Sequence, residues 1–291
     1  MPNMKNLVLL FYAFLSLALL PTAQRLIPRD PVGRYGIERD PTPNENWMHW
    51  SSFIPSVLDT NDNSEVPLGD NSVLTDGMLV SAAMEAWTQM NTVLRVPPYN
   101  RGPKTIPKAM SVLHVPGQLF FSSSVKGIGA FELKFQESCA SAALQRCAST
   151  TGGSHTNKGN CGEPSAVHLF CLKNPDKAGK VKNGEGLPQP ARVVTVGVDN
   201  NFQNLAIKNP CGPPPGNTDP TKWGCDRFVS DVKVRAILSG TTTPETVPTN
   251  WKFEFSRVCL VEGLLRKRFS MPDGNDTAPF LDVRSLVMLA S

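Results

Sequence analysis

The sequence predicts an α/β fold in which a mixed sheet of about five strands is flanked by helices. Residues 110–125 contain two β-rich runs on either side of a Pro-Gly pair, a pattern typical of a hairpin. Two further β-rich runs occupy residues 191–199 and 232–238. Apolar side chains recur at helical spacing over residues 74–96, and an Ala/Val/Leu/Phe run after Cys161 indicates a second helix. Helix and strand signals therefore alternate through the middle of the chain.

The segments between these elements also carry local signals. Residues 128–135 are a short apolar segment that leads into a helical stretch over residues 138–148. Residues 174–190 are rich in Lys, Gly and Pro, which predicts an exposed insertion. Residues 251–265 alternate like a strand and then become helical in pattern.

Residues 1–23 have the features of a secretory signal peptide. Lys5 precedes an apolar run of 14 residues, and small residues follow up to Ala23. This run is shorter than the about 20 apolar residues that a helix needs to cross a bilayer. We therefore expect a secreted, extracellular protein whose mature form does not engage the membrane.

The rest of the chain divides into three parts. Residues 24–73 are rich in Pro, Asn and Asp, which predicts an irregular N-terminal extension. An apolar patch is expected to anchor this extension on the core, and it consists of Trp47, Trp50, Phe53 and Ile54. Residues 74–265 hold the helix and strand signals and form the predicted functional domain. Residues 266–291 are a C-terminal tail, whose basic start is either a processing site or a solvated charge run.

The charge of the chain does not by itself indicate a class of partner. The formal net charge of +4 is too small to argue for nucleic-acid binding. Four lysines lie between Cys171 and Gly184, and they either form a solvated loop or offer a positive patch to a polyanionic substrate. The sequence has no G-x-S-x-G, Walker, H-E-x-x-H or dinucleotide-binding motif.

Seven cysteines are an odd number for an exported chain. Three metal ligands and two disulfides would use all seven, and so would three disulfides and one free thiol. Cys139 and Cys147 would lie about 12 Å apart on one straight helix, beyond the reach of a disulfide. Cys171 and Cys259 are natural partners for that pair, with the connectivity left open.

The first chemical motif is a cysteine two residues before a glutamate. Cys161 and Glu163 stand at the start of the helix predicted after residue 161, and Pro164 suits the first helical turn because a missing N–H costs nothing there. At this spacing both side chains can face a cleft at the helix N-terminus. The exposed N–H groups and the helix dipole favour a thiolate at that position.

The second motif is a pair of cysteines some fifty residues further on. Pro210-Cys211 follows the β-rich run 191–199, and Cys225 precedes a segment that can begin a helix. Two such helix starts placed side by side would give three sulfur ligands and leave a fourth position to water, as in a catalytic zinc site. The predicted zinc ligands are Cys161, Cys211 and Cys225, with Glu163 as the non-ligating proton carrier.

The spacing within this pair is unusual. In the Pro-Cys-x-x-Cys motif of zinc deaminases, two residues lie between the cysteines. Here 13 residues lie between Cys211 and Cys225, including a Pro-Pro-Pro run. Either the insertion is a loop that leaves both thiols at the start of the helix, or the two cysteines form a disulfide.

The order of hairpin, C-x-E helix, strand, Pro-Cys…Cys helix and strand resembles the cytidine deaminase-like superfamily. The motif Asn160-Cys-Gly-Glu-Pro-x-Ala is similar to that of the toxin-type members of this superfamily. The resemblance covers roughly residues 75–262. It implies a three-layer fold, a Zn²⁺ cofactor and a substrate that contains a nucleobase, whether nucleoside, nucleotide or single-stranded nucleic acid. Further residues that can line the cleft are Asn160, His155 and Trp223, and Arg227 can offset the negative charge of three thiolates.

Two functions follow from these observations. The first is a secreted zinc-dependent deaminase, in which a hydroxide on the metal attacks the base and Glu163 moves the protons. The alternative is a secreted binding or effector protein that is stapled by disulfides and has no catalytic metal.

Overall fold

The structure is a computed structural model, and it describes residues 33–40, 48–69, 73–96, 101–102, 105–127, 129–212 and 221–256. The signal peptide 1–23, Trp47, Cys259 and the tail 266–291 lie outside these residues. No helix within the described ranges is both long and apolar enough to cross a membrane.

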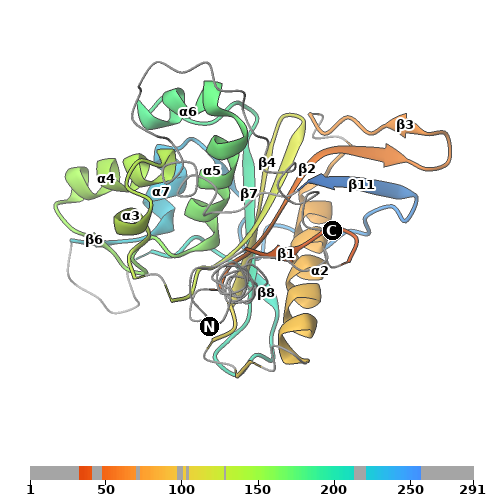
Figure 1. The fold of residues 1–291 in the computed structure, drawn as a ribbon, viewed down its shortest axis with the longest axis horizontal. Helices are drawn as coiled ribbons and strands as arrows, with labels where there is room; N and C mark the ends of the chain where they lie inside the picture. The colour runs from red at the N-terminus through yellow and green to blue at the C-terminus, as the bar shows by residue number, and fades with distance from the viewer. Residues whose placement is uncertain are drawn as a thin grey trace, which may run out of the picture.

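The fold is mixed α/β, with one large sheet between two layers of helices (Figure 1). The strands are β1 (Glu38–Arg39), β2 (Trp50–Asp59), β3 (Ser64–Glu65), β4 (Ala109–Val115), β5 (Gln118–Ser123), β6 (Ser154–His155), β7 (Arg192–Gly197), β8 (Ala206–Lys208), β9 (Lys222–Trp223), β10 (Arg235–Ala236) and β11 (Trp251–Ser256). The helices are α2 (Asp76–Arg95), α3 (Phe131–Lys134), α4 (Cys139–Thr151), α5 (Gly162–Lys173), α6 (Pro175–Lys182) and α7 (Cys225–Asp231).

The main sheet has nine strands in the described residues, and it follows the order β1-β2-β5-β4-β7-β10. The hairpin β4–β5 and the pair β4–β7 are antiparallel, whereas β10 runs parallel to β7. The predicted mixed sheet is therefore present, but the expectation of about five strands is wrong. The additional strands are β1, β2, β3 and β8, whereas β11 corresponds to the strand-like start of residues 251–265.

We expected an irregular N-terminal extension, but its described residues contain the strands β1, β2 and β3. Residues 50–59 form β2, which pairs with β5 on one side and with β11 on the other. The expected anchoring is confirmed for Trp50, Phe53 and Ile54, which are all buried. The insertion at 174–190 also contains a helix, α6, whose Val181 is fully buried.

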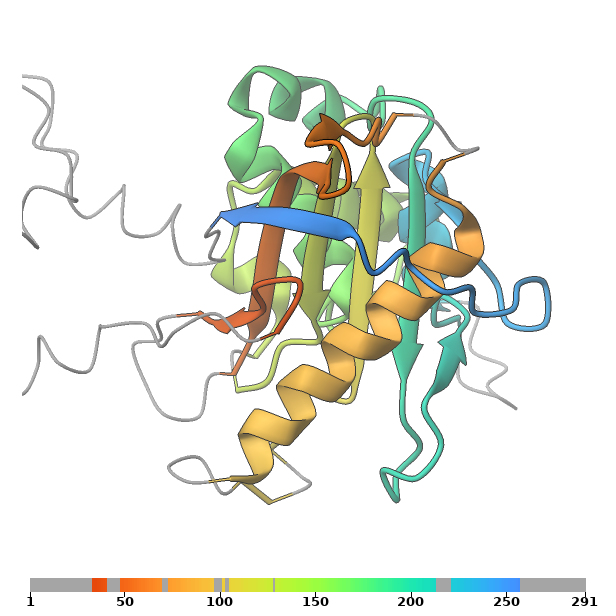
Figure 2. The same cartoon turned by 90° about the vertical axis from the view of Figure 1, so that its right-hand side faces the viewer.

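Both faces of the central strands are buried. In Figures 1 and 2, α2 crosses one face of the sheet while α3 to α7 cover the other. Consecutive residues of one strand belong to different cores. Leu113 of β4 packs on the α5 side, and its neighbour Val112 packs on the α2 side. The adjacent apolar side chains in these strands, such as Leu119, Phe120 and Phe121 of β5, follow from burial on both faces.

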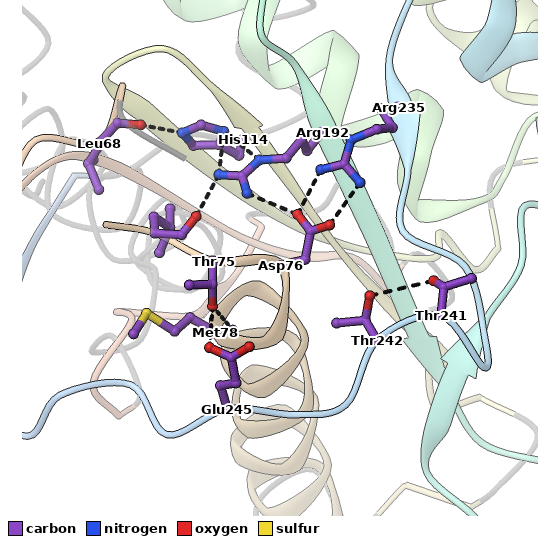
Figure 3. A network of polar contacts seen from close by, with 11 residues as sticks. Leu68, Thr75, Asp76, Met78, His114, Arg192, Arg235, Thr241, Thr242 and Glu245 are labelled. Carbon is purple, nitrogen blue, oxygen red and sulfur yellow. Dashed lines mark hydrogen bonds and ion pairs between the residues drawn. The ribbon is translucent and has the colours of Figure 1, made fainter. Parts of the chain in front are cut away.

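A buried polar network fastens α2 to the end of the sheet (Figure 3). Arg192 of β7 is 2 % exposed and pairs with Asp76 in the first turn of α2, with Nη1 and Oδ1 2.9 Å apart. Arg235 of β10 binds the same carboxylate from the solvent side. His114 lies beside Arg192 and donates from Nε2 to the carbonyl oxygen of Leu68, so its Nδ1 accepts from the guanidinium.

One disulfide joins α4 to α5, between Cys139 and Cys171. This is one of the pairings that the sequence left open. The other described cysteines are free thiols, and one of these, Cys147, is buried.

Candidate metal centre

Cys161 occupies the N-cap position of α5, as the sequence predicted. Its backbone is extended, with φ −75° and ψ 162°, and its side chain makes no capping hydrogen bond. Gly162, Glu163 and Pro164 form the first turn. The sulfur of Cys161 is therefore available to other groups at the helix N-terminus.

Cys211 closes the N-terminus of the other helix, α7, in spite of the long insertion. Its sulfur accepts the N–H of Cys225 at 3.3 Å, and its carbonyl oxygen accepts the N–H of Asp226 at 3.1 Å. A side chain on Gly224 would be impossible here, because a Cβ would lie 1.9 Å from the carbonyl oxygen of Cys211. Cys211 and Cys225 are both free thiols and do not form the disulfide that was the alternative, and residues 213–220 between them lie outside the described residues.

Four side chains converge where these helix starts meet. The ligand atoms of His155, Cys161, Cys211 and Cys225 all lie within 4.8 Å of one another. The sulfurs of Cys161 and Cys211 are 3.5 Å apart, and Nε2 of His155 is 3.3 Å from the sulfur of Cys225. In a tetrahedral site with metal–sulfur bonds of about 2.3 Å, neighbouring sulfurs lie about 3.8 Å apart. The group therefore has the spacing and the donor atoms to hold a metal ion.

The pKa values of the three thiols are shifted in different directions. Hydrogen bonds from Cys161 and Cys225 hold the pKa of Cys211 well below its usual range. The hydrogen bond to Cys211 raises the pKa of Cys161, and burial raises the pKa of Cys225. A metal takes thiolates as ligands, so metal binding at this cluster would release thiol protons.

His155 is brought to the cluster by a tight loop. Its Nδ1 accepts the backbone N–H groups of Asn157 at 3.0 Å and Gly159 at 3.2 Å. Gly159 has a φ of 71°, and that left-handed conformation turns the chain back toward the ring. Because Nδ1 accepts hydrogen bonds, the proton of the neutral ring is on Nε2 and points at the sulfur of Cys225.

Glu163 is 4 % exposed and lies beside the cluster from the first turn of α5. The side chain of Thr195 on β7 lies beside this carboxylate. Burial raises the pKa of this carboxyl, and the charge of Cys211 adds to the effect. A buried acid of this kind next to ligand sulfurs is typical of a functional site.

Comparison of the chain with protein-family models, curated proteins and solved structures finds no match.

The other predicted site residues are placed differently. Trp223 is buried, with its ring edge-on to His155 at 4.9 Å between centroids, so it packs against the cluster. Asn160 donates to the carbonyl oxygen of Gly129, and its own side-chain oxygen is buried without a hydrogen bond among the described residues. Arg227 is exposed on α7 near Cys147. Burial raises the pKa of Cys147 to about 11, and the charge of Arg227 only opposes that shift.

Proposed function

We propose that this protein is a zinc-dependent deaminase that acts on a nucleobase in a nucleoside, nucleotide or single-stranded nucleic acid. The observation that carries the proposal is the position of Glu163, a buried carboxylate in the same helical turn as Cys161 and next to three thiols. Burying an acid is costly, and a purely structural metal site gains nothing from it. A hydrolytic site needs such a group.

The arrangement of elements supports the proposal. A hairpin is followed by the helix of Cys161, then by strand β7, the helix of Cys225 and the parallel strand β10. This is the order on which the resemblance to the deaminase superfamily rests. It also places both helix N-termini, with their partial positive charge, at the cluster.

In the proposed reaction, Cys161, Cys211 and Cys225 hold the metal. Zinc, when bound, supplies Lewis-acid activation of water at neutral pH. Glu163 would carry the two protons of the attacking water one at a time, the first to the ring nitrogen and the second to the departing ammonia. The Nε2–H of His155 donates to the sulfur of Cys225, which moderates the negative charge of three thiolates.

A second candidate is a closed structural metal site with His155 as the fourth ligand, in a protein without catalytic activity. The closeness of Nε2 to Cys225 favours it. The two backbone N–H groups that donate to Nδ1 of His155 favour the catalytic alternative. A ring that accepts hydrogen bonds at Nδ1 and binds a metal at Nε2 carries no proton on either nitrogen, so it would have to be an imidazolate.

The variant His155→Gln separates these two candidates. In the catalytic site the purified variant keeps about one zinc per chain, because zinc needs only three protein ligands. In the closed site the variant loses most of its metal. Cys225→Ser is the matched control and should lose zinc in both cases, whereas trimming residues 213–220 should leave zinc in place.

The decisive experiment uses Glu163→Gln. The variant should keep its zinc and its fold, and turnover should fall by about 10²- to 10⁴-fold because an amide does not carry a proton. Ammonia release would be measured with cytidine, adenosine and single-stranded nucleic acids, with the exposed Glu185→Gln as the control. Full activity in Glu163→Gln, or no activity of the wild type on any of these substrates, would contradict the proposal.

A further inference from the structure

The sulfurs of Cys161 and Cys211 face each other at the metal centre. They lie 3.5 Å apart, although the two residues are 50 positions apart in the sequence. The sulfur–sulfur bond of a disulfide is about 2.0 Å long, so the two atoms would have to approach by about 1.5 Å. Cys161 is the N-cap of α5, and its side chain makes no capping hydrogen bond that a rotation would break. The pair is therefore within side-chain reach of a covalent bond.

Exposure separates this pair from the rest of the cluster. Cys161 and Cys211 are partly exposed, whereas Cys225 and His155 are buried. The sulfur of Cys225 also has a neighbour of its own, because it lies 3.3 Å from Nε2 of His155. A dissolved oxidant meets the partly exposed sulfurs first, since the reactivity of a thiol depends on access to it. A covalent link within the cluster should therefore join Cys161 to Cys211 and leave Cys225 as a thiol.

The chain already contains one disulfide, and it involves the same helix. Cys139 is joined to Cys171, which lies in α5, the helix that begins directly after Cys161. Disulfides form and persist in oxidising compartments, and the signal peptide predicted for residues 1–23 would lead the chain into one. There the two partly exposed thiols of the cluster would meet the same oxidising chemistry that joined Cys139 to Cys171. A bound metal ion is one way to keep them reduced.

A metal ion and a disulfide cannot share these two sulfurs. Zinc binds cysteine as the thiolate, and a sulfur that belongs to a disulfide is no longer a thiolate. A link between Cys161 and Cys211 would remove two sulfur ligands at once and leave only Cys225 and His155 of the cluster. Two residues are fewer than the three protein ligands that a catalytic zinc site needs. The zinc-bound state and the disulfide state are therefore mutually exclusive.

We propose that the metal centre is a redox switch, in which loss of zinc lets Cys161 and Cys211 form a disulfide that prevents zinc from binding again. The oxidant is a small disulfide such as oxidised glutathione. The S–H bonds of the two cysteines break and a sulfur–sulfur bond forms between them, while the oxidant takes up two electrons and two protons as its own sulfur–sulfur bond becomes two thiols. A dithiol reductant reverses the reaction. The inference rests on the zinc site of the proposed function but not on deamination.

The test treats zinc-loaded and zinc-free protein with oxidised glutathione, blocks the remaining thiols and maps the disulfides by mass spectrometry after trypsin digestion. Cleavage after Lys and Arg puts Cys211 in peptide 209–222, and it puts Cys161 together with Cys171 in peptide 159–173. In the zinc-free protein, peptide 209–222 should be linked to peptide 159–173, which also keeps its link to the peptide of Cys139. In the zinc-loaded protein, peptide 209–222 should carry a blocked thiol. The linked protein should bind less than about a tenth of the zinc of the reduced protein, and dithiothreitol should restore binding.

Variants identify the sulfurs, and a second measurement needs no variant. Cys211→Ser should not form the link, whereas Cys225→Ser should still form it in the absence of zinc. Cys147→Ser is the matched control, because it removes a buried free thiol that is not part of the cluster and should behave like the wild type. When the protein as purified is treated with a chelator and oxidised glutathione together, the zinc lost per chain should equal the fraction of linked chains.

The inference is overturned if the zinc-free protein keeps both cysteines as thiols, if the link reaches Cys225 instead, or if linked chains retain zinc. It is also overturned if zinc-loaded protein becomes linked as fast as zinc-free protein. The outcome is independent of the deaminase assay. A zinc-dependent link in a protein that releases no ammonia would support the switch and contradict the proposed function. A zinc-binding protein that deaminates a substrate and never forms the link would support the proposed function and overturn the switch.

Discussion

Acid should destabilise this protein through His114, far from the metal centre. The ring is fully buried, its Nε2 donates to the carbonyl oxygen of Leu68 and its Nδ1 accepts from Arg192 at 3.3 Å (Figure 3). A second proton would have to be placed on Nδ1, against the guanidinium. Burial, with the charge of Arg192, lowers the pKa of His114 from 6.5 to about 4.

The sign and size of the effect follow from linkage. Between pH 6.5 and 4 the unfolded chain binds a proton at His114 that the folded chain does not, so the free energy of unfolding falls as the pH falls. The contribution is fully present above pH 6.5, and the loss is about 2 kcal/mol at pH 5 and about 3 kcal/mol at pH 4.

Urea unfolding at pH 7.5, 6 and 5 would measure this loss, with His114→Gln as the reference. The variant is expected to be less stable at pH 7.5, but its free energy of unfolding should change less between pH 7.5 and 5 by about 2 kcal/mol. Other titrating groups contribute equally to both proteins and cancel. Parallel pH profiles for the wild type and the variant would refute the reasoning.

Gly162→Ala should weaken zinc binding at least about tenfold and cost about 1–3 kcal/mol of stability, because its Cβ would meet Ser111 at 2.3 Å. Chelator competition and urea unfolding measure both, and Gly179→Ala, a helical site with nothing within 4 Å, should not affect zinc affinity. Removing the disulfide with Cys139→Ala opens a crosslink that spans 32 residues to Cys171. The chain-entropy relation gives a loss of about 4 kcal/mol, and equal urea midpoints for the variant and the oxidised wild type would contradict it.

The sequence predicts the elements that carry the cysteines well. The N-terminal helix expected over residues 74–96 is α2, and the hairpin and the run 191–199 are present as β4, β5 and β7. These elements have clear local signals, namely helical spacing, a Pro-Gly turn and β-branched runs. The run 232–238 yields only the two-residue strand β10, since Lys233 adopts a φ of 56° and ends the turn after α7.

Strand β2 was missed because the segment around it is rich in Pro, Asn and Asp, and β2 itself contains Pro55. A proline cannot donate to a sheet ladder, so it argues against a central strand. In the structure the pairing with β5 ends at Ile54, and the register with β11 shifts between Glu254 and Ser256, opposite the proline. The sheet thus accommodates Pro55 with a bulge that depends on a strand from the other end of the chain, which no local pattern reports.

The sequence indicated the three sulfurs, Glu163 and a place for His155 and Trp223 at the candidate site, but not the contacts that bring these residues together. His155 lies six residues before Cys161, and only the left-handed turn at Lys158 and Gly159 brings its ring to the cluster. The neighbour of Glu163, Thr195, belongs to a strand that looks like ordinary core in sequence. The Gly-rich loop before Cys161 was the one signal that could have indicated a tight return.

Because β2 pairs with β11, it must wait for its partner strand while the chain is being synthesised. Trp251 pairs with Asp59, so β2 leaves the ribosome about 190 residues before its partner exists. At about 5–20 residues per second, that interval is on the order of 10–40 s. Throughout it, the side of β2 that β11 later covers presents unpaired backbone groups next to Ile54 and Val57, the kind of edge that promotes aggregation. The last strand of the described fold is therefore also the one that ends this exposure.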